Sequence, residues 1–173
     1  MSEVKNLDAI INKIGFEIAQ IIDETMINKI LGVLANDGVY AMWVYCLDKL
    51  DWKYTEEEEF KKNQLYKFIE QLNKLPVQIE INSIELKVIH SEFNKIFDLI
   101  KEINKLSKEI KNIKDKDEKK KKMEEKQQKE KERNKILNKF FWKLSNDIHQ
   151  LLFFKDIVEK ALIYARYHAK TMD

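Results

Sequence analysis

The feature that most constrains this chain is its near lack of residues that interrupt helices. Its 173 residues contain three glycines and one proline. Because these residues mark most tight turns and helix ends, a chain with so few of them is expected to form long helices. An apolar share of 44% is enough to build a core without a disulfide or metal. The sequence therefore predicts an all-α helical bundle in which residues 1–173 form a single helical domain.

The first half of the chain predicts three helices from its apolar spacing. Apolar residues recur at three and four positions over Glu3–Glu24, and a shifted apolar face covers Met26–Leu34. After these, either Asn36 or Asp37 can cap a third helix over Val39–Lys49. Since this third segment is apolar on nearly all sides, we expect it to be the buried central helix.

Capping patterns predict where two further helices begin. Thr55 precedes four glutamates in a capping-box arrangement, and this helix is expected to end at Leu75, before Pro76. The last helix is expected to begin near Asp156, which has Glu159 three residues later. Its predicted buried stripe consists of Ile157, Val158, Ala161, Leu162, Ala165, Ala169 and Met172.

Residues 84–135 predict a long charged coiled-coil helical arm. A heptad seam is formed by Ile89, Phe93, Ile96, Ile100, Ile103, Ser107 and Ile110. Between Lys114 and Lys135 the only apolar residue is Met123, so the segment reads as an ordered solvated helix, a hairpin tip or a disordered loop. We favour ordered helix, with Ile113 paired to Ile136 or with a partner chain on the seam, over a hairpin that turns near Asp117.

The arm is also the most basic part of the chain. Lys101 to Lys135 contains 15 basic and 9 acidic residues, whereas the whole chain carries a net charge of only +2. A basic segment attracts phosphate backbones because binding releases condensed counterions. The plainer interpretation is a solvated helix face.

Enzymatic function is the class with the least support. The chain lacks a phosphate-binding G-x-x-x-x-G-K-[ST] loop, an H-E-x-x-H motif and a G-x-S-x-G elbow. No two of His90, His149 and His168 have the spacing of a helical metal site. We therefore predict no catalytic residues, no metal and no cofactor.

Features of the chain also bear on its compartment. Cys46 is the single cysteine and lies within an apolar run, which predicts a buried, inert thiol. The N-terminal sequence MSEVKNLDAI lacks the basic and apolar regions of a signal peptide, and no run reaches the length expected of a membrane span. We expect a cytoplasmic protein with no membrane association.

Three pieces of the chain, read in order, resemble the small subunit of type III CRISPR effector complexes, the Cmr type in particular. They are ILGVLANDGVYAMWVYCLDK (Ile30–Lys49), QLYKFIEQLNKL (Gln64–Leu75) and VEKALIYARYHAKTM (Val158–Met172). The first is similar to a short helix, a glycine turn and a buried aromatic helix ending in lysine. The third is similar to the family's final helix with its aromatic and basic ending.

The resemblance implies a non-catalytic, RNA-binding role. Such subunits are small helical bundles that stack along guide RNA and target RNA, contact other effector subunits and hold the sugar-phosphate backbone. Carried over by position, the RNA-binding candidates are Lys49, Arg166 and Lys170. Lys53 and Lys143 are added on charge and expected exposure alone.

The arm departs from this family, since residues 84–135 are longer than its middle segment. The arm could be a contact between subunits or an additional phosphate clamp. The alternative function, from another class, is a structural or adaptor protein whose coiled-coil arm binds a partner helix.

Overall fold

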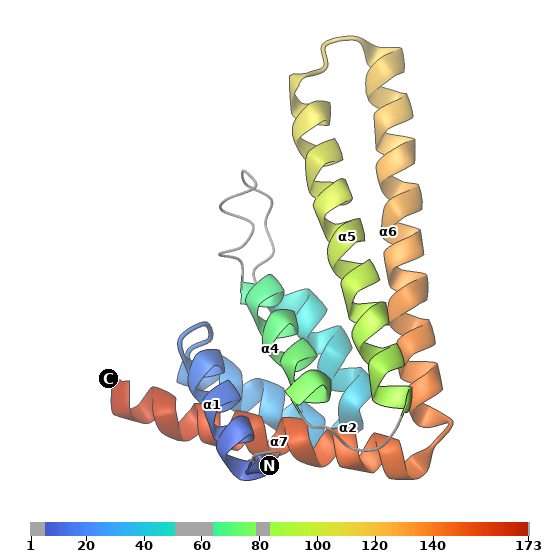
Figure 1. Cartoon of the computed structure of the whole chain (residues 1–173). Helices are drawn as coiled ribbons and strands as arrows, with labels where there is room; N and C mark the ends of the chain where they lie inside the picture. The colour runs from blue at the N-terminus through green and yellow to red at the C-terminus, as the bar shows by residue number, and fades with distance from the viewer. Residues whose placement is uncertain (1–5, 51–63, 79–83, 173) are drawn as a thin grey trace, which may run out of the picture.

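The computed structural model describes residues 6–50, 64–78 and 84–172, and all the elements in these ranges are α-helices. The all-α prediction is therefore confirmed. Figure 1 shows a body of four helices from which the remaining two project side by side as an arm. The helices are α1 (Leu7–Ala19), α2 (Glu24–Lys49), α4 (Gln64–Gln78), α5 (Ile84–Asn112), α6 (Lys116–Ser145) and α7 (Ile148–Met172).

The body is organised around α7, which packs against both α1 and α2 (Figure 1). Helix α1 also contacts α4, and α4 in turn contacts the base of α5. The predicted stripe of α7 is buried except for Met172, which is 44% exposed at the end of the helix. The core is completed by isoleucines of α1 and α2 and by the apolar face of α4, namely Leu65, Phe68, Ile69, Leu72 and Leu75.

The predicted start of α7 is wrong by eight residues, because the helix begins at Ile148 and not near Asp156. Asp147 is the cap: its Oδ1 accepts hydrogen bonds from the backbone N–H groups of His149 (2.9 Å) and Gln150 (3.2 Å). These bonds satisfy donors that the first turn of a helix leaves open, and they lower the pKa of the Asp147 carboxyl. Asp156 instead lies inside the helix.

A cap also separates the first two helices. The helix α1 ends at Ala19, earlier than the predicted Glu24, and Asp23 caps α2 by accepting a hydrogen bond from the Met26 backbone N–H (2.9 Å). Near this turn, the Gln64 side chain donates to the Ile21 carbonyl (3.2 Å) and so ties the start of α4 to it.

The predicted break around Gly38 is present as a kink within α2. Gly38 has φ 90° and ψ −176°, a conformation that is accessible essentially to glycine alone. Asn36 and Asp37 lie inside α2 before the kink, whereas we expected one of them to cap a separate third helix. Beyond the kink, burial is on one side only, because Tyr40 and Val44 are 51% and 48% exposed.

By length and composition α2 is apolar enough to cross a membrane, and within the described ranges no other helix passes this test. The expectation that no stretch is long and apolar enough to span a membrane is thus corrected. The helix has buried residues on both sides of its kink, among them Ile30, Leu34, Met42 and Trp43, and these belong to the core of the bundle. The core helix of a globular protein can pass the same test of length and composition as a membrane-spanning helix.

Burial of the Cys46 thiol leads to a prediction for its reactivity. The side chain is fully buried, and burial raises the pKa of the thiol well above its ordinary value. Because the thiolate is the reactive form, we expect Ellman's reagent at mildly alkaline pH to label Cys46 only after addition of guanidinium. Rapid labelling of the native protein would contradict the packing of α2 in the core.

The described part of α4 begins at Gln64, so the expected cap at Thr55 lies outside the described residues. Its end differs from the prediction: the helix continues past Leu75 and Pro76 to Gln78. The bias of a residue before proline against helix is a preference, and here the apolar face of α4, buried up to Leu75, overrides it.

The arm is a simple helical hairpin, an arrangement that we did not favour from the sequence. The helix α5 ends at Asn112, and α6 begins at Lys116 after a turn at residues 113–115. Asp115 stabilises this turn by accepting hydrogen bonds from the backbone of Asp117 (3.0 Å) and Glu118 (2.8 Å). The expected pairing of Ile113 with Ile136 is therefore wrong, because these residues lie toward opposite ends of α6.

Candidate nucleic-acid interface

Two ion pairs fix the register of the arm. The Glu109 carboxylate forms an ion pair with Nζ of Lys122 at 2.9 Å, and the Glu102 carboxylate forms one with Nζ of Lys129 at 2.5 Å. The two glutamates are seven residues apart on α5, and the two lysines are seven residues apart on α6. The α5 and α6 helices thus run antiparallel in a heptad register, as in a coiled coil.

The side of α6 that faces α5 is made of long cationic side chains. Lys122, Lys126, Lys129 and Arg133 follow steps of four, three and four, which is a heptad pattern. The lysines keep only 28–33% of their side-chain surface exposed, and Arg133 is 7% exposed. The aliphatic stems of these lysines can cover apolar residues of α5 while their ammonium groups reach water. The fully buried Ile103 shows that this seam excludes solvent.

The charges within this seam are matched to each other. The hydrogen bond between Lys122 and Glu109 raises the pKa of the lysine and lowers the pKa of the Glu109 carboxyl. Lys129 also has a raised pKa, chiefly through its hydrogen bond to Glu102. Lys126 pairs with Glu130 along α6 at 3.7 Å. Lys122 and Lys129 therefore hold the hairpin together, and all three inner lysines have their charge balanced by a glutamate.

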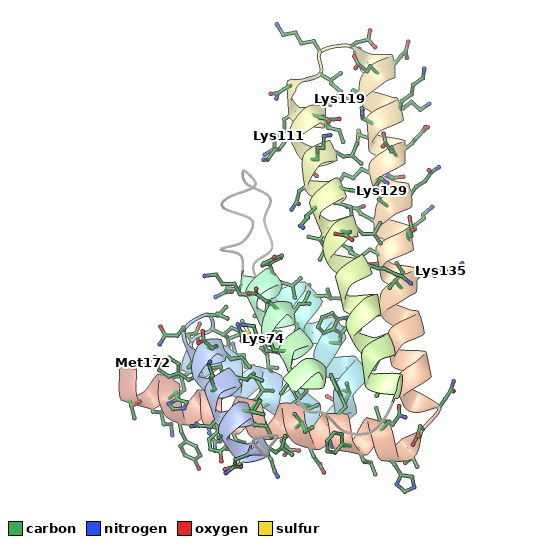
Figure 2. The ribbon with its side chains drawn as sticks, viewed as in Figure 1. Lys74, Lys111, Lys119, Lys129, Lys135 and Met172 are labelled. Carbon is green, nitrogen blue, oxygen red and sulfur yellow. The ribbon has the colours of Figure 1, made fainter. Side chains whose placement is uncertain are left out.

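The tip of the arm, in contrast, carries lysines without ion pairs. Seven lysines near the turn, which we call the tip lysines, have no carboxylate of a described residue within 4.0 Å. In Figure 2 the labelled Lys111 and Lys119 lie at this end, remote from the body. The tip lysines are Lys108, Lys111, Lys114, Lys116, Lys119, Lys120 and Lys121.

The RNA-binding residues expected from the resemblance are not brought together as one site. Lys49 is the last residue of α2 and pairs with its neighbour Asp48 at 2.7 Å. Lys170 of α7 pairs at 3.6 Å with Glu24, the first residue of α2. The two lysines therefore lie at opposite ends of a kinked helix of 26 residues.

Arg166 and Lys170 are one turn apart on α7, but both are engaged by neighbours. The Arg166 guanidinium carbon lies 5.1 Å from the ring centre of Tyr167, whose side chain is 55% exposed. Lys53 and the side chain of Lys143 lie outside the described residues. None of the tip lysines was predicted individually as a binding residue, although their clustering is visible in the sequence as local charge.

Polar side chains between α1 and α7 serve as contacts within the body. The Tyr164 hydroxyl donates to the Asp8 carboxylate at 2.8 Å, which raises the pKa of the tyrosine. Nε2 of His168 lies 2.8 Å from Oδ1 of Asn12, and its ring packs edge-on against Phe16. Over the described part of the chain, no three His, Cys, Asp or Glu residues gather as a potential metal site.

Comparisons of the chain with known protein families, with curated proteins and with solved structures find no match.

Proposed function

We propose that this protein is a non-catalytic RNA-binding subunit, and that its arm supplies the main contact with the phosphate backbone. The observation that supports this most is the separation of charge along the arm. The inner lysines pair with glutamates across the hairpin or along α6, whereas the tip lysines are unpaired. Unpaired surface lysines can neutralise phosphates and so release the cations condensed on the backbone, with a gain in entropy.

The composition of the arm favours contact with phosphates over contact with bases. Between Asp98 and Lys135 there is no aromatic residue on which a base could stack. Arginine, the side chain best suited to bidentate recognition of guanine, occurs there only at Arg133, which is buried. Binding should therefore be independent of sequence and sensitive to salt.

The resemblance supplies the biological setting of the proposal. In a type III CRISPR effector complex this chain would be the small subunit, stacked along guide RNA and target RNA in the cytoplasm and in contact with other effector subunits and copies of itself. The projecting arm is an addition to that subunit, and its reach beyond the body suits it to a strand held by neighbouring subunits (Figure 1).

The proposal predicts RNA binding that depends on the tip. We expect the full chain to bind a short unstructured RNA, with log K falling against log salt at a slope of about −3 if four lysines contact phosphates. Lys116→Glu with Lys120→Glu should weaken binding more than Arg166→Glu with Lys170→Glu, because Arg166 and Lys170 already have neighbours. Fluorescence anisotropy at low and moderate salt measures both effects.

Two results would contradict this function. One is an absence of RNA binding by the unmodified protein at low salt. The other is binding that is unchanged by the Lys116→Glu and Lys120→Glu pair, which would assign the contact to a surface other than the tip. The circular dichroism of the Lys116→Glu and Lys120→Glu variant should match that of the parent, since these two lysines are exposed and make no ion pairs with described residues.

A further inference from the structure

The two broad faces of the arm differ in charge. One of them, the acidic face, contains both ion pairs between the helices. Glu102 and Glu109 occupy it on α5, where they bond Lys129 and Lys122. Lys122 also contacts Glu125 at 3.7 Å, which places Glu125 on the same face of α6.

A row of acids extends this face along α6. Glu118, Glu125 and Glu132 recur every seven residues and so share one side of the helix. Glu125 and Glu132 both contribute to the raised pKa of Lys129, after its hydrogen bond to Glu102. The acidic face thus consists of Glu102, Glu109, Glu118, Glu125 and Glu132.

On α6 the position directly after these acids is lysine in two heptads and Arg133 in the third. Lys119 and Lys126 follow Glu118 and Glu125 directly, so they lie about 100° further around the helix. Lys122 projects between the two rows, toward α5, as its bond to Glu109 requires. Lys119 and Lys126 therefore lie on the other side of the hairpin seam from the acids.

The same separation holds on α5. Lys111 is two residues beyond Glu109, which places it about 160° around the helix from that carboxylate. Lys108 is six residues beyond Glu102, about 120° away on the same side as Lys111. With Lys116 at the start of α6, the unpaired lysines on this side form the basic face: Lys108, Lys111, Lys116 and Lys119.

We propose that the basic face of the arm binds a row of phosphates while the acidic face is turned away from the nucleic acid. The inference rests on the proposed function and adds a direction to it. On this side of α6 the Glu130 carboxylate is paired with the inner Lys126 and not with a lysine of the basic face. A phosphate backbone that approached the acidic face would meet a row of carboxylates, and like charges in proximity repel.

Two triple variants with the same change in charge test the orientation. The first replaces Lys108, Lys111 and Lys119 with glutamine on the basic face. The second, its matched control, replaces Lys105, Lys131 and Lys135, which are not tip lysines and lie on the acidic or outer side of the hairpin. Lys135 is visible pointing away from α5 in Figure 2. Neither set includes a lysine of a described ion pair.

We expect the first variant to bind RNA about tenfold or more weakly than the parent and to lower the salt slope by about 2, since the slope changes by about 0.7 for each lost phosphate contact with a single strand. The control should lose less than about threefold in affinity, because its lysines contribute only at long range through solvent. Anisotropy titrations of one labelled RNA at several salt concentrations give both values.

Each other outcome overturns a stated part of the proposal. Equal losses in the two variants, with the parent still binding RNA, would reject the orientation and leave the proposed function in place. A parent that does not bind RNA would reject the proposed function itself. Competition by poly-glutamate as strong as that by RNA of equal charge would identify an acidic protein as the partner and overturn the assignment to phosphates.

Discussion

Replacing Gly15 with alanine is expected to destabilise the protein, although alanine is the better helix former. A Cβ atom at Gly15 would lie 2.6 Å from the Cβ of Tyr164 and 2.8 Å from the carbonyl oxygen of Ala161. The latter atom belongs to the backbone of α7, so the clash cannot be relieved by a change of rotamer. The two helices must move apart, which typically costs about 1–3 kcal/mol, and valine should cost more than alanine.

Gly32 provides the matched control within the same chain. It also lies inside a helix, but a Cβ added there would have no atom within 4 Å. Alanine at this position should stabilise the protein by about 0.5–1 kcal/mol, because glycine loses more conformational freedom on folding. Urea unfolding followed by circular dichroism compares the two variants. If the Gly15→Ala variant were as stable as the Gly32→Ala variant, or more stable, α1 and α7 would not be packed as closely as described.

The contact at Gly15 illustrates what apolar spacing can and cannot predict. Steps of three and four residues identified the buried face of α1 and that of α7 from the sequence alone. They did not predict that the two faces meet, nor that Gly15 lies where the helices cross. That close approach depends on small residues of both helices, Ala161 and Ala165 among them, and only the packed structure brings them together.

Helix ends were predicted less well than helix faces because several residues can serve as caps. Asp156 and Asp147 are both chemically suited to begin α7, and the capping-box spacing favoured the wrong one. The buried Phe154 lies before Asp156, so core packing requires helix there and selects the earlier cap. The same competition explains α4, where burial extends the helix past Leu75.

The arm was misjudged because apolar residues alone were counted. A seam with Ile103 on one side and only lysines on the other appeared unable to form a hairpin. Lysine and arginine stems can cover apolar surface, however, and the heptad spacing of Lys122, Lys129 and Arg133 was the available signal. The repeat alone does not separate the tip lysines from the inner ones, because Lys119 continues it toward the turn.

The candidate RNA-binding residues were chosen by likeness of sequence and by charge, which give no spatial relation. Lys49 and Lys170 are distant because α2 separates them, and Lys170 is balanced by Glu24. Ion pairing of this kind depends on tertiary structure. It decides which cations remain available for a ligand, so it cannot be read from composition.

The arm and the body are expected to unfold as separate units. Leu99, Ile103 and Leu106 are buried in α5, yet they lie outside the cluster of described residues that forms the core of the body. Phe68 of α4 is equally buried and belongs to that core. Ile100 of α5 and Leu144 of α6 belong to the body core at the base of the arm. Opening the part of the arm beyond them would expose its own seam while the body keeps its contacts, as in other proteins that unfold in stages.

Two cavity-forming substitutions test this independence. Phe68→Ala should lower the global free energy of unfolding by about 3–5 kcal/mol. Ile103→Ala should cost about 2–5 kcal/mol, but we expect that loss to be confined to the arm. Hydrogen exchange followed by mass spectrometry should show faster exchange only in peptides of α5 and α6 for Ile103→Ala, and in peptides of the body helices for Phe68→Ala. Faster exchange throughout the body in the Ile103 variant would show instead that the two seams form one cooperative unit. In that case the arm would contribute to the stability of the body as well as to the proposed binding of RNA.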